Sequence, residues 1–340
     1  MFRDSSDINY RTIEQIQNEY KKDNIEWSLG FSGGKDSSAL LKLTYIALYN
    51  LKLKHKPLHV IYCDTGVEIP MICSLVKKTL RDLLVEANEN EIPIILRILV
   101  PPLKDRYFAK VIGHGYPPPT NKFRWCTDRL RIRPIQKILK NTDKKNIILL
   151  GIRKDESIER NKAIIRYATE NEYFFRQSNN NTLIFSPIIK YTFSDVWHIL
   201  INYELPKSIQ GETIKNYYNS LNSENTSNHE GRLGCWTCTV IRKDRAVENL
   251  IANGYKELEP LLAFRNWLIH IREDRNYRCK QRRNGANGPG PFTIEARKEI
   301  LNKLIFAQNN CPWKLIDEEE IEYIKNQWEL DMNSSEYLEK

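Results

Sequence analysis

The chain has 340 residues, of which 41% are apolar and 28% are charged. This composition excludes a disordered or collagen-like chain, and the length allows one good-sized core with a smaller module beside it. No apolar run approaches the roughly 20 residues of a membrane helix. The polar first residues also lack the apolar stretch of a secretion signal. We therefore expect a folded, cytoplasmic protein without a membrane span.

The charge balance and the cysteines narrow the classes of partner and cofactor. The formal net charge is +9, which is compatible with a polyanionic partner because clustered Lys and Arg release counterions from phosphate backbones. The seven cysteines are an odd number in a chain without an export signal. They therefore favour reduced thiols, metal ligands or a catalytic sulfur over a disulfide framework.

Apolar periodicity predicts alternating strands and helices in the first half of the chain. Helices are expected at 9–24, 37–52, 69–88 and 128–140, and strands at 26–31, 57–63, 92–100 and 146–150. Such alternation is typical of βαβ units, so we expect an α/β fold with a doubly wound, mainly parallel sheet. Ligands bind beyond the carboxyl ends of parallel strands. Three loops should therefore converge on one cleft: 32–38, 64–68 and 151–160.

The sequence pattern changes near residue 206. A polar stretch rich in Asn and Ser at 219–228 leads to a Cys-x-x-Cys pair, and the rest is mostly helical in pattern. We expect a nucleotide-binding domain at 1–205 and a mostly helical domain at 206–340 that carries the Cys-x-x-Cys pair and basic segments.

A glycine-rich string, Ser-Gly-Gly-Lys-Asp-Ser at 32–37, follows a predicted strand and opens a predicted helix. Its backbone N–H groups and the helix dipole therefore point at the same anion. Adjacent glycines also let the backbone approach a phosphate closely. The spacing differs from that of a Walker A loop. An ordinary tight turn between strand and helix is the alternative interpretation.

The string resembles the pyrophosphate loop (PP-loop) of the N-type ATP pyrophosphatases, which split ATP between its α and β phosphates. The resemblance implies that Lys35 neutralises charge and that Asp36 helps to hold Mg²⁺. It implies ATP and pyrophosphate binding by the loop and by two neighbouring strand ends: Ser32, Gly33, Gly34, Lys35, Asp36, Ser37 and Ser38, with Asp64 and Gly151.

Two further strings at predicted strand ends, Asp-Thr-Gly at 64–66 and Gly-x-Arg-x-x-Glu-Ser-x-x-Arg at 151–160, resemble motifs of the phosphoadenosine phosphosulfate (PAPS) reductase family. In that family the first lies by the adenosine, and the second brings arginines to anionic substrate groups. The resemblance implies such roles for Arg153 and Arg160. Either string could instead be a solvated loop or a helix cap. The family's Asp-Val-Trp helix is matched at 195–197, where we expect core packing and capping.

Three cysteines lie in distinctive surroundings. Cys126 has five basic side chains near it between positions 122 and 133, and positive charge favours a thiolate, so we expect a depressed pKa. Cys235 and Cys238 have a spacing that lets two sulfurs bind one zinc ion or one iron–sulfur cluster. A four-sulfur site needs one more ligand, and the candidates are Cys279, Cys63, Cys73 and Cys311.

Several separate blocks extend the resemblance: 113–117, 123–134, 234–240, 259–268 and 282–292. Together they are similar to the DndC and SspD sulfurtransferases of bacterial DNA phosphorothioation. DndC-type proteins are associated with a [4Fe–4S] cluster, so the resemblance implies Cys126, Cys235 and Cys238 as ligands. It also implies three partners: DNA, a cysteine desulfurase as sulfur donor, and other phosphorothioation proteins.

These inferences lead to a mechanistic hypothesis. A DNA phosphate oxygen attacks the α-phosphate of ATP, pyrophosphate leaves, and AMP departs when sulfur attacks. Positioning and charge neutralisation carry the first step, with Lys35, Asp36, Arg153 and Arg160 as catalytic residues and Cys126 as the sulfur relay. DNA would contact the basic segments 122–133 and 272–283. Two alternatives stay open: a sulfonucleotide reductase, and a DNA-binding regulator that senses ATP without cleaving it.

Overall fold

The computed structural model describes residues 5–140, 146–154, 158–167, 169–176, 182–221 and 234–333. The chain divides into two compact units. Unit 1 comprises Met1–Cys63, Met71–Leu99 and Lys137–Asn216, and unit 2 comprises Asp64–Pro70, Val100–Gln136 and Tyr217–Lys340. Each unit is therefore built from three segments, whereas the predicted boundary at residue 206 divides the chain once. That boundary stays a prediction about which segments fold independently.

Unit 1 contains a six-stranded sheet. Its strands are β1 Glu26–Gly30, β2 Leu58–Cys63, β3 Ile94–Leu99, β4 Asn146–Leu149, β5 Phe174–Arg176 and β6 Leu183–Phe185. The strand order is β3-β2-β1-β4-β6-β5. All neighbours pair in parallel except β5 and β6, which are antiparallel. The doubly wound, mainly parallel sheet predicted from the sequence is confirmed.

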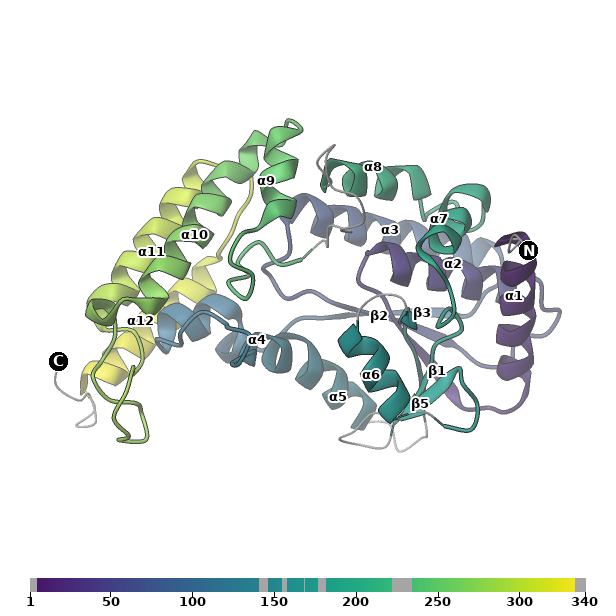
Figure 1. The fold of residues 1–340 in the computed structure, drawn as a ribbon, viewed down its shortest axis with the longest axis horizontal. Coiled ribbons are helices and arrows are strands. Elements are labelled where there is room, and N and C mark those ends of the chain that lie inside the picture. Colours follow the sequence, from purple (N-terminus) through teal and green to yellow (C-terminus); the bar gives the residue numbers. More distant parts are fainter. Residues whose placement is uncertain are drawn as a thin grey trace. The chain divides into compact units, whose positions relative to one another are not determined.

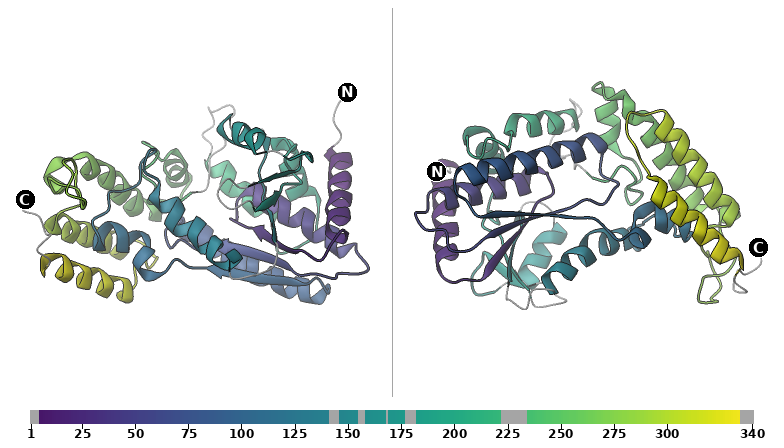
Figure 2. Two further views of the ribbon diagram at one scale, coloured as in Figure 1. Left: turned by 90° about the horizontal axis from the view of Figure 1, so that it is seen from below. Right: turned by 180° about the vertical axis from the view of Figure 1, so that it is seen from behind.

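Helices cover both faces of this sheet. Those lying wholly or partly in unit 1 are α1 Ser5–Lys21, α2 Lys35–Tyr49, α3 Pro70–Glu89, α5 Arg133–Lys140, α6 Ile158–Arg166, α7 Phe193–Asn202 and α8 Gly211–Leu221. Right-handed crossovers place α2 and α3 on one face, because the chain moves outward from β1 to β2 to β3. The chain then returns across the opposite face to reach β4, and Figures 1 and 2 show α5 and α6 there. The helix α2 packs against α1 and α7.

The core of unit 1 includes a group of buried aromatic rings and a second cluster rich in isoleucine. The Trp27 ring of β1 is fully buried and lies 5.4 Å from the Tyr20 ring and 5.9 Å from the Phe185 ring, centroid to centroid. Ile164 of α6 packs with Ile148 of β4 in a second cluster. Burial on both faces explains why the central strands read as nearly continuous apolar runs rather than alternating ones.

Unit 2 is mainly helical within its described residues. Its helices are α4 Trp125–Thr127, α9 Arg245–Ala252, α10 Glu259–Glu273, α11 Ile294–Asn309 and α12 Glu318–Asn333. The helices α10 and α11 pack together, and α11 and α12 both pack on a π-helical turn, Ala109–Gly113. The indole of Trp328 in α12 donates a hydrogen bond of 2.8 Å to the Ile112 carbonyl in that turn. A segment from the middle of the chain thus completes the C-terminal helical core.

The predicted elements of the first half are present, with shifted ends. The helix expected at 37–52 begins two residues earlier at Lys35, and the one expected at 128–140 is a π-helical turn, Asp128–Ile132, followed by α5. The strands β5 and β6 were not predicted because three residues each are too few to show alternation. No helix in the described residues has the length and apolar character needed to cross a membrane.

Candidate functional site

The glycine-rich string forms the turn from β1 into α2. The N-cap of α2 is Gly34, in extended backbone, and no side chain caps this helix end among the described residues. The first N–H groups of a helix have no partner within the helix. The amide groups at the start of α2 are therefore suited to an anion, as predicted from the sequence.

Two serine hydroxyls close the turn. Ser32 Oγ and Ser37 Oγ lie 3.1 Å apart, and the Ser37 hydroxyl donates to the Gly34 carbonyl at 2.9 Å. The Ser32 amide donates to Ser37 Oγ at 3.2 Å. Ser38, which was also predicted to bind nucleotide, is fully buried. The hydroxyls that belong to the turn itself are thus those of Ser32 and Ser37.

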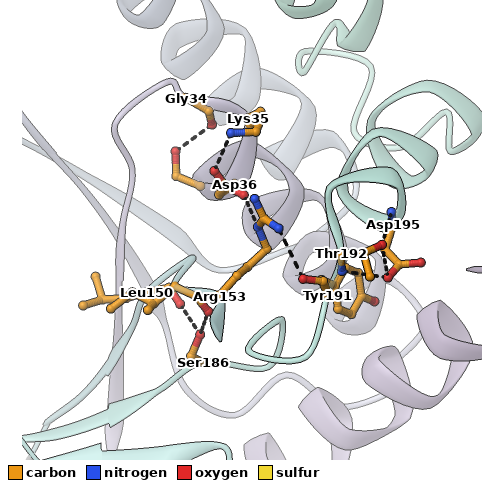
Figure 3. Close-up of polar contacts among 11 residues, drawn as sticks. Gly34, Lys35, Asp36, Leu150, Arg153, Ser186, Tyr191, Thr192 and Asp195 are labelled. Atoms are coloured by element: carbon orange, nitrogen blue, oxygen red, sulfur yellow. Dashed lines mark hydrogen bonds and ion pairs between the residues drawn. The ribbon is translucent and has the colours of Figure 1, made fainter. Parts of the chain in front are cut away.

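A network of buried charges lies directly behind the turn (Figure 3). Lys35 Nζ is 3.1 Å from one carboxylate oxygen of Asp36, and Arg153 Nε is 2.6 Å from the other. Arg153 is fully buried and also donates to the Tyr191 carbonyl at 3.3 Å. Two cations thus hold one carboxylate at the start of α2.

The end of β4 packs against the turn at a position where only glycine fits. A Cβ on Gly151 would lie 2.7 Å from the Asp36 carbonyl oxygen. Gly33 has φ +73°, and a Cβ there would lie 2.1 Å from a methyl carbon of Val76. The predicted convergence of 32–38 with the start of 151–160 is therefore confirmed, since Arg153 reaches Asp36. Residues 155–157 and the side chain of Arg160 lie outside the described part of the structure.

Three residues of this region were missed by the sequence analysis. Ser186 Oγ lies 2.8 Å from the Leu150 carbonyl and 2.7 Å from the Ile152 carbonyl, which fixes the end of β4 beside the end of β6. Tyr191 supplies the carbonyl that holds Arg153, and the Phe193 ring centroid lies 5.9 Å from Lys35 Nζ. Recognising β6 as a strand would have pointed to them, because they follow its carboxyl end.

The predicted capping role in α7 is confirmed. Thr192 is the N-cap, and Asp195 completes a capping box: its carboxylate accepts from the Thr192 amide at 2.8 Å, and its own amide donates to the Thr192 hydroxyl at 3.3 Å. Val196 is fully buried. The Asp-Val-Trp string therefore anchors the start of α7, close in sequence to Tyr191 and Phe193.

The Asp-Thr-Gly string belongs to unit 2. The Gly66 amide donates to the Asp64 carboxylate at 3.1 Å, and the Thr65 hydroxyl donates to the Glu68 carboxylate at 2.6 Å. The three residues of the string line a cavity of about 280 Å³ in this unit, together with Arg106 and others. Asp64, predicted to bind nucleotide, thus lies at a cavity wall inside unit 2.

The three distinctive cysteines gather around one tyrosine in unit 2. Tyr107 is buried and interacts electrostatically with all three, and burial raises its pKa. Cys126 lies in α4, while Cys235 forms an isolated β-bridge with Glu68. The Cys235 sulfur is 3.8 Å from a guanidinium nitrogen of Arg131. The structure therefore brings together thiols that are more than a hundred residues apart in the sequence.

The expectation of a depressed pKa at Cys126 was wrong. Burial raises the pKa of the Cys126 thiol, an effect that exceeds the opposing influence of Arg131. Burial raises the pKa of Cys235 to about 12, with the Glu68 carboxylate adding to the effect. The neighbouring cations bind acids instead: Arg129 is 2.9 Å from Asp105, and Arg133 is 2.7 Å from Asp128. These thiols are therefore protonated near neutral pH.

The described residues offer no group of three His, Cys, Asp or Glu side chains arranged to hold a metal ion. Cys126, Cys235 and Cys238 are close enough to influence one another electrostatically, but they are not placed as a ligand set. Cys279 lies in a different part of unit 2, where its amide donates to the Pro291 carbonyl at 2.9 Å. Within the described part of the chain, the cysteines as arranged do not fit the expected cluster.

The sequence matches the profile of the phosphoadenosine phosphosulfate reductase domain over residues 26–241, which is more than half of the chain. The chain belongs to this family. The matched region includes the PP-loop, the buried charge network, the Asp-Thr-Gly string and the Cys-x-x-Cys pair.

The chain is also similar to two uncharacterized proteins of Methanocaldococcus jannaschii. One is 28% identical over 228 residues, which are 66% of this chain and 38% of the relative. The other is 27% identical over 263 residues, which are 73% of this chain and 53% of the relative. The aligned part of the chain thus spans only about two fifths to half of the length of these relatives.

Solved structures with a similar fold include a PAPS reductase from Candida auris, with 14% identity and a TM-score of 0.41, covering 71% of this chain and 99% of that one. Another is a U34-tRNA thiolase from Methanococcus maripaludis that has a [4Fe–4S] cluster. It shows 13% identity and a TM-score of 0.38, and the match covers 79% of each chain.

Proposed function

We propose that this chain cleaves ATP between its α and β phosphates and transfers AMP to an acceptor. The acceptor in this proposal is a backbone phosphate of DNA, which is thereby activated for replacement of an oxygen by sulfur. The observation that carries the first part is the uncapped start of α2 beside the Lys35, Asp36 and Arg153 network.

The geometry suits pyrophosphate as the leaving group. Helix N–H groups and the Lys35 side chain stabilise negative charge that grows on the β and γ phosphates as the bond to the α-phosphate breaks. Lys35 is 3% exposed, so its charge is poorly screened and acts strongly on a phosphate at the turn. Asp36 would also be the carboxylate closest to a bound Mg²⁺, in competition with its two cationic partners.

Adenylation answers a specific chemical difficulty. An oxide is a poor leaving group at phosphorus, whereas AMP is a good one. The DNA phosphate oxygen forms a bond to the α-phosphorus as pyrophosphate leaves. A persulfide sulfur, from a cysteine desulfurase, then bonds to the DNA phosphorus as AMP leaves. A second thiol cleaves the S–S bond, which leaves the phosphorothioate on DNA and a disulfide on the thiols.

The DNA part of the proposal is supported by the net charge of +9 and by the resemblance to the DndC and SspD sulfurtransferases. The thiols of unit 2 are candidate sulfur carriers. Because burial raises the pKa of Cys126 and Cys235, either thiol must lose a proton when a sulfur donor arrives.

The experiment uses ATP labelled at the α-phosphate, with Mg²⁺ and with or without duplex DNA. Pyrophosphate is expected in both cases, with the label on the DNA where the duplex is present and on AMP where water replaces the acceptor. Labelled ADP or the absence of any product contradicts the proposal. Lys35→Ala should lower the rate by about 10²–10³-fold, the usual loss for removing one charge-stabilising group. Lys52→Ala, which removes an exposed lysine of the same unit, should leave the rate unchanged.

A second candidate function is reduction of a sulfonucleotide, which the family's own description favours. Such an enzyme consumes an adenylyl sulfate and a thiol reductant, and it has no need of ATP. Release of sulfite from a sulfonucleotide, with no AMP formed from ATP, would establish this function instead.

A further inference from the structure

Residues 278–292 of unit 2 form a hairpin, called here the basic hairpin. Isolated bridges pair Arg278 with Phe292 and Gln281 with Asn287. The Arg282 amide donates to the Ala286 carbonyl at 3.0 Å, which closes a tight turn around Gly285, where φ is +76°. Figures 1 and 2 show this segment as a loop that extends beyond the end of α10.

The base of the hairpin is anchored in the core of unit 2. Phe292 is fully buried, and its amide donates to the Gly115 carbonyl at 2.8 Å. Arg278 Nε donates to the Gly290 carbonyl at 2.6 Å, and its guanidinium lies 5.1 Å from the centroid of the Phe292 ring. These contacts fix the base, so the tip is held in a defined position relative to unit 2.

The tip is exposed and strongly basic. Every residue from 280 to 287 is exposed, and the chain has no Asp or Glu between positions 275 and 294. Among the described residues, Arg283 is the one tip cation in contact with an acid, since its guanidinium lies 3.1 Å from Asp331. Lys280 and Arg282 therefore present their charge to solvent.

The structure separates these residues from two other cations of the predicted DNA-binding segment 272–283, Arg272 and Arg278. Arg272 donates to the Pro119 and Thr239 carbonyls at 3.0 and 2.8 Å, so it holds the fold of unit 2 together. Arg278 anchors the base of the hairpin, and burial lowers its pKa to about 10. A surface for a polyanion is thus concentrated at the tip.

We propose that the tip of the basic hairpin enters a groove of duplex DNA and places Lys280 and Arg282 on backbone phosphates. This inference rests on the proposed function for its choice of DNA, and it identifies the element that makes the contact. A two-stranded ribbon fits the major groove of B-form DNA, whereas the major groove of A-form RNA is too deep and narrow. The tip has no aromatic residue between 280 and 290, so it lacks the stacking platform that single strands require.

Amide side chains on the tip also suit contacts with the base edges of duplex DNA. Gln281, Asn284 and Asn287 are exposed on the tip and can donate to and accept from base edges. Glycines at 285 and 288 have positive φ, +76° and +136°. They let the turn stay narrow enough to pass between two phosphate backbones.

The test measures binding of the full chain to a short fluorescent DNA duplex as a function of salt. Each phosphate contact contributes about −0.9 to the slope of log K against log salt. The double variant Lys280→Ala with Arg282→Ala should therefore make the slope shallower by about 2 and weaken binding roughly tenfold at low salt. The double variant Lys52→Ala with Arg81→Ala removes two exposed cations from unit 1 and should change neither quantity.

An unchanged slope in the hairpin variant overturns the inference, as does tighter binding of the wild type to duplex RNA or to single strands. Cleavage of ATP in the absence of DNA should be the same in the wild type and the hairpin variant. Failure of the proposed function has a different signature. In that case no AMP forms from ATP, while duplex binding still depends on Lys280 and Arg282.

Discussion

Asp36 in unit 1 and Cys235 in unit 2 are both partly buried, but their surroundings differ. The two carboxylate oxygens of Asp36 are held by Lys35 and Arg153. Cys235 instead has the Glu68 carboxylate beside it, and burial dominates its pKa. At Cys235 the single guanidinium of Arg131 does not offset the effects of burial and of Glu68 on the pKa.

Cys126 also shows that basic residues near a cysteine in the sequence need not lower the pKa of its thiol. The positive segment around Cys126 suggested a thiolate, yet Arg129 and Arg133 are bound to Asp105 and Asp128. Hydrogen bonds to Thr127 and, more weakly, the charge of Arg131 oppose the effect of burial on Cys126. The cations of the PP-loop network, by contrast, point at the one carboxylate between them.

The largest expected effect on stability comes from breaking the charge network of unit 1. Arg153→Ala should lower the free energy of unfolding by about 3–5 kcal/mol, since removing one partner of a buried pair leaves a buried charge uncompensated. Denaturant unfolding measures the change. Arg81→Ala, at an exposed position of the same unit, should have an effect within about 0.5 kcal/mol. An equally small effect of Arg153→Ala would mean that Lys35 alone suffices to hold Asp36.

Glu320 in unit 2 is a buried carboxyl that should make the stability of the protein depend on pH. Burial raises its pKa from 4.5 to about 7, although the Ala109 amide donates to it at 2.9 Å and Arg106 opposes the change. A raised folded-state pKa means that stability is greatest below pH 4.5 and is lost as pH rises toward 7. One pKa unit corresponds to about 1.4 kcal/mol, so a rise from 4.5 to about 7 means a loss of about 3 kcal/mol of stability at most.

Glu320→Gln should therefore unfold at higher denaturant concentration than the wild type at pH 8, with the advantage shrinking as pH falls toward 4.5. The neighbouring Glu319 has a side chain that is 70% exposed, and Glu319→Gln should show no such pH dependence. A wild-type stability that is flat between pH 5 and 8 would contradict a neutral Glu320.

A smaller effect on stability distinguishes backbone strain from a steric clash, through a comparison of one glycine in each unit. Gly33 and Gly66 have nearly the same φ, +73° and +74°, but a Cβ meets Val76 at the first and nothing within 4 Å at the second. Both Ala variants carry the cost of the left-handed conformation. Gly33→Ala should be less stable than Gly66→Ala by a further ~1–3 kcal/mol, the usual cost of overpacking.

Thermal or denaturant unfolding of the two variants gives this difference directly. Adding Val76→Ala to Gly33→Ala removes the conflicting methyl groups, so the steric part of the loss should be partly recovered. Equal stability of Gly33→Ala and Gly66→Ala would show that the PP-loop turn can shift away from α3 without cost.

Much of unit 1 could be predicted from the sequence because its signals are local. The string at 32–37 lies between a strand and a helix that periodicity identifies, and right-handed crossovers bring 151–153 to the same sheet edge. The convergence of these two loops followed from that topology, whereas the contact of Arg153 with Asp36 was found only in the structure. Ser186 and Tyr191 were missed because β6 is three residues long and leaves no periodic trace.

The sequence by itself determined the parallel α/β sheet, the position of the PP-loop at the start of α2, and the capping box of α7. Each depends on residues a few positions apart, where backbone geometry relates spacing to position. Only the tertiary structure decided the state of the thiols, the assembly of unit 2 from three segments, and which cations remain exposed on the basic hairpin. These depend on burial and on ion pairs between distant residues, and neither is encoded in local spacing.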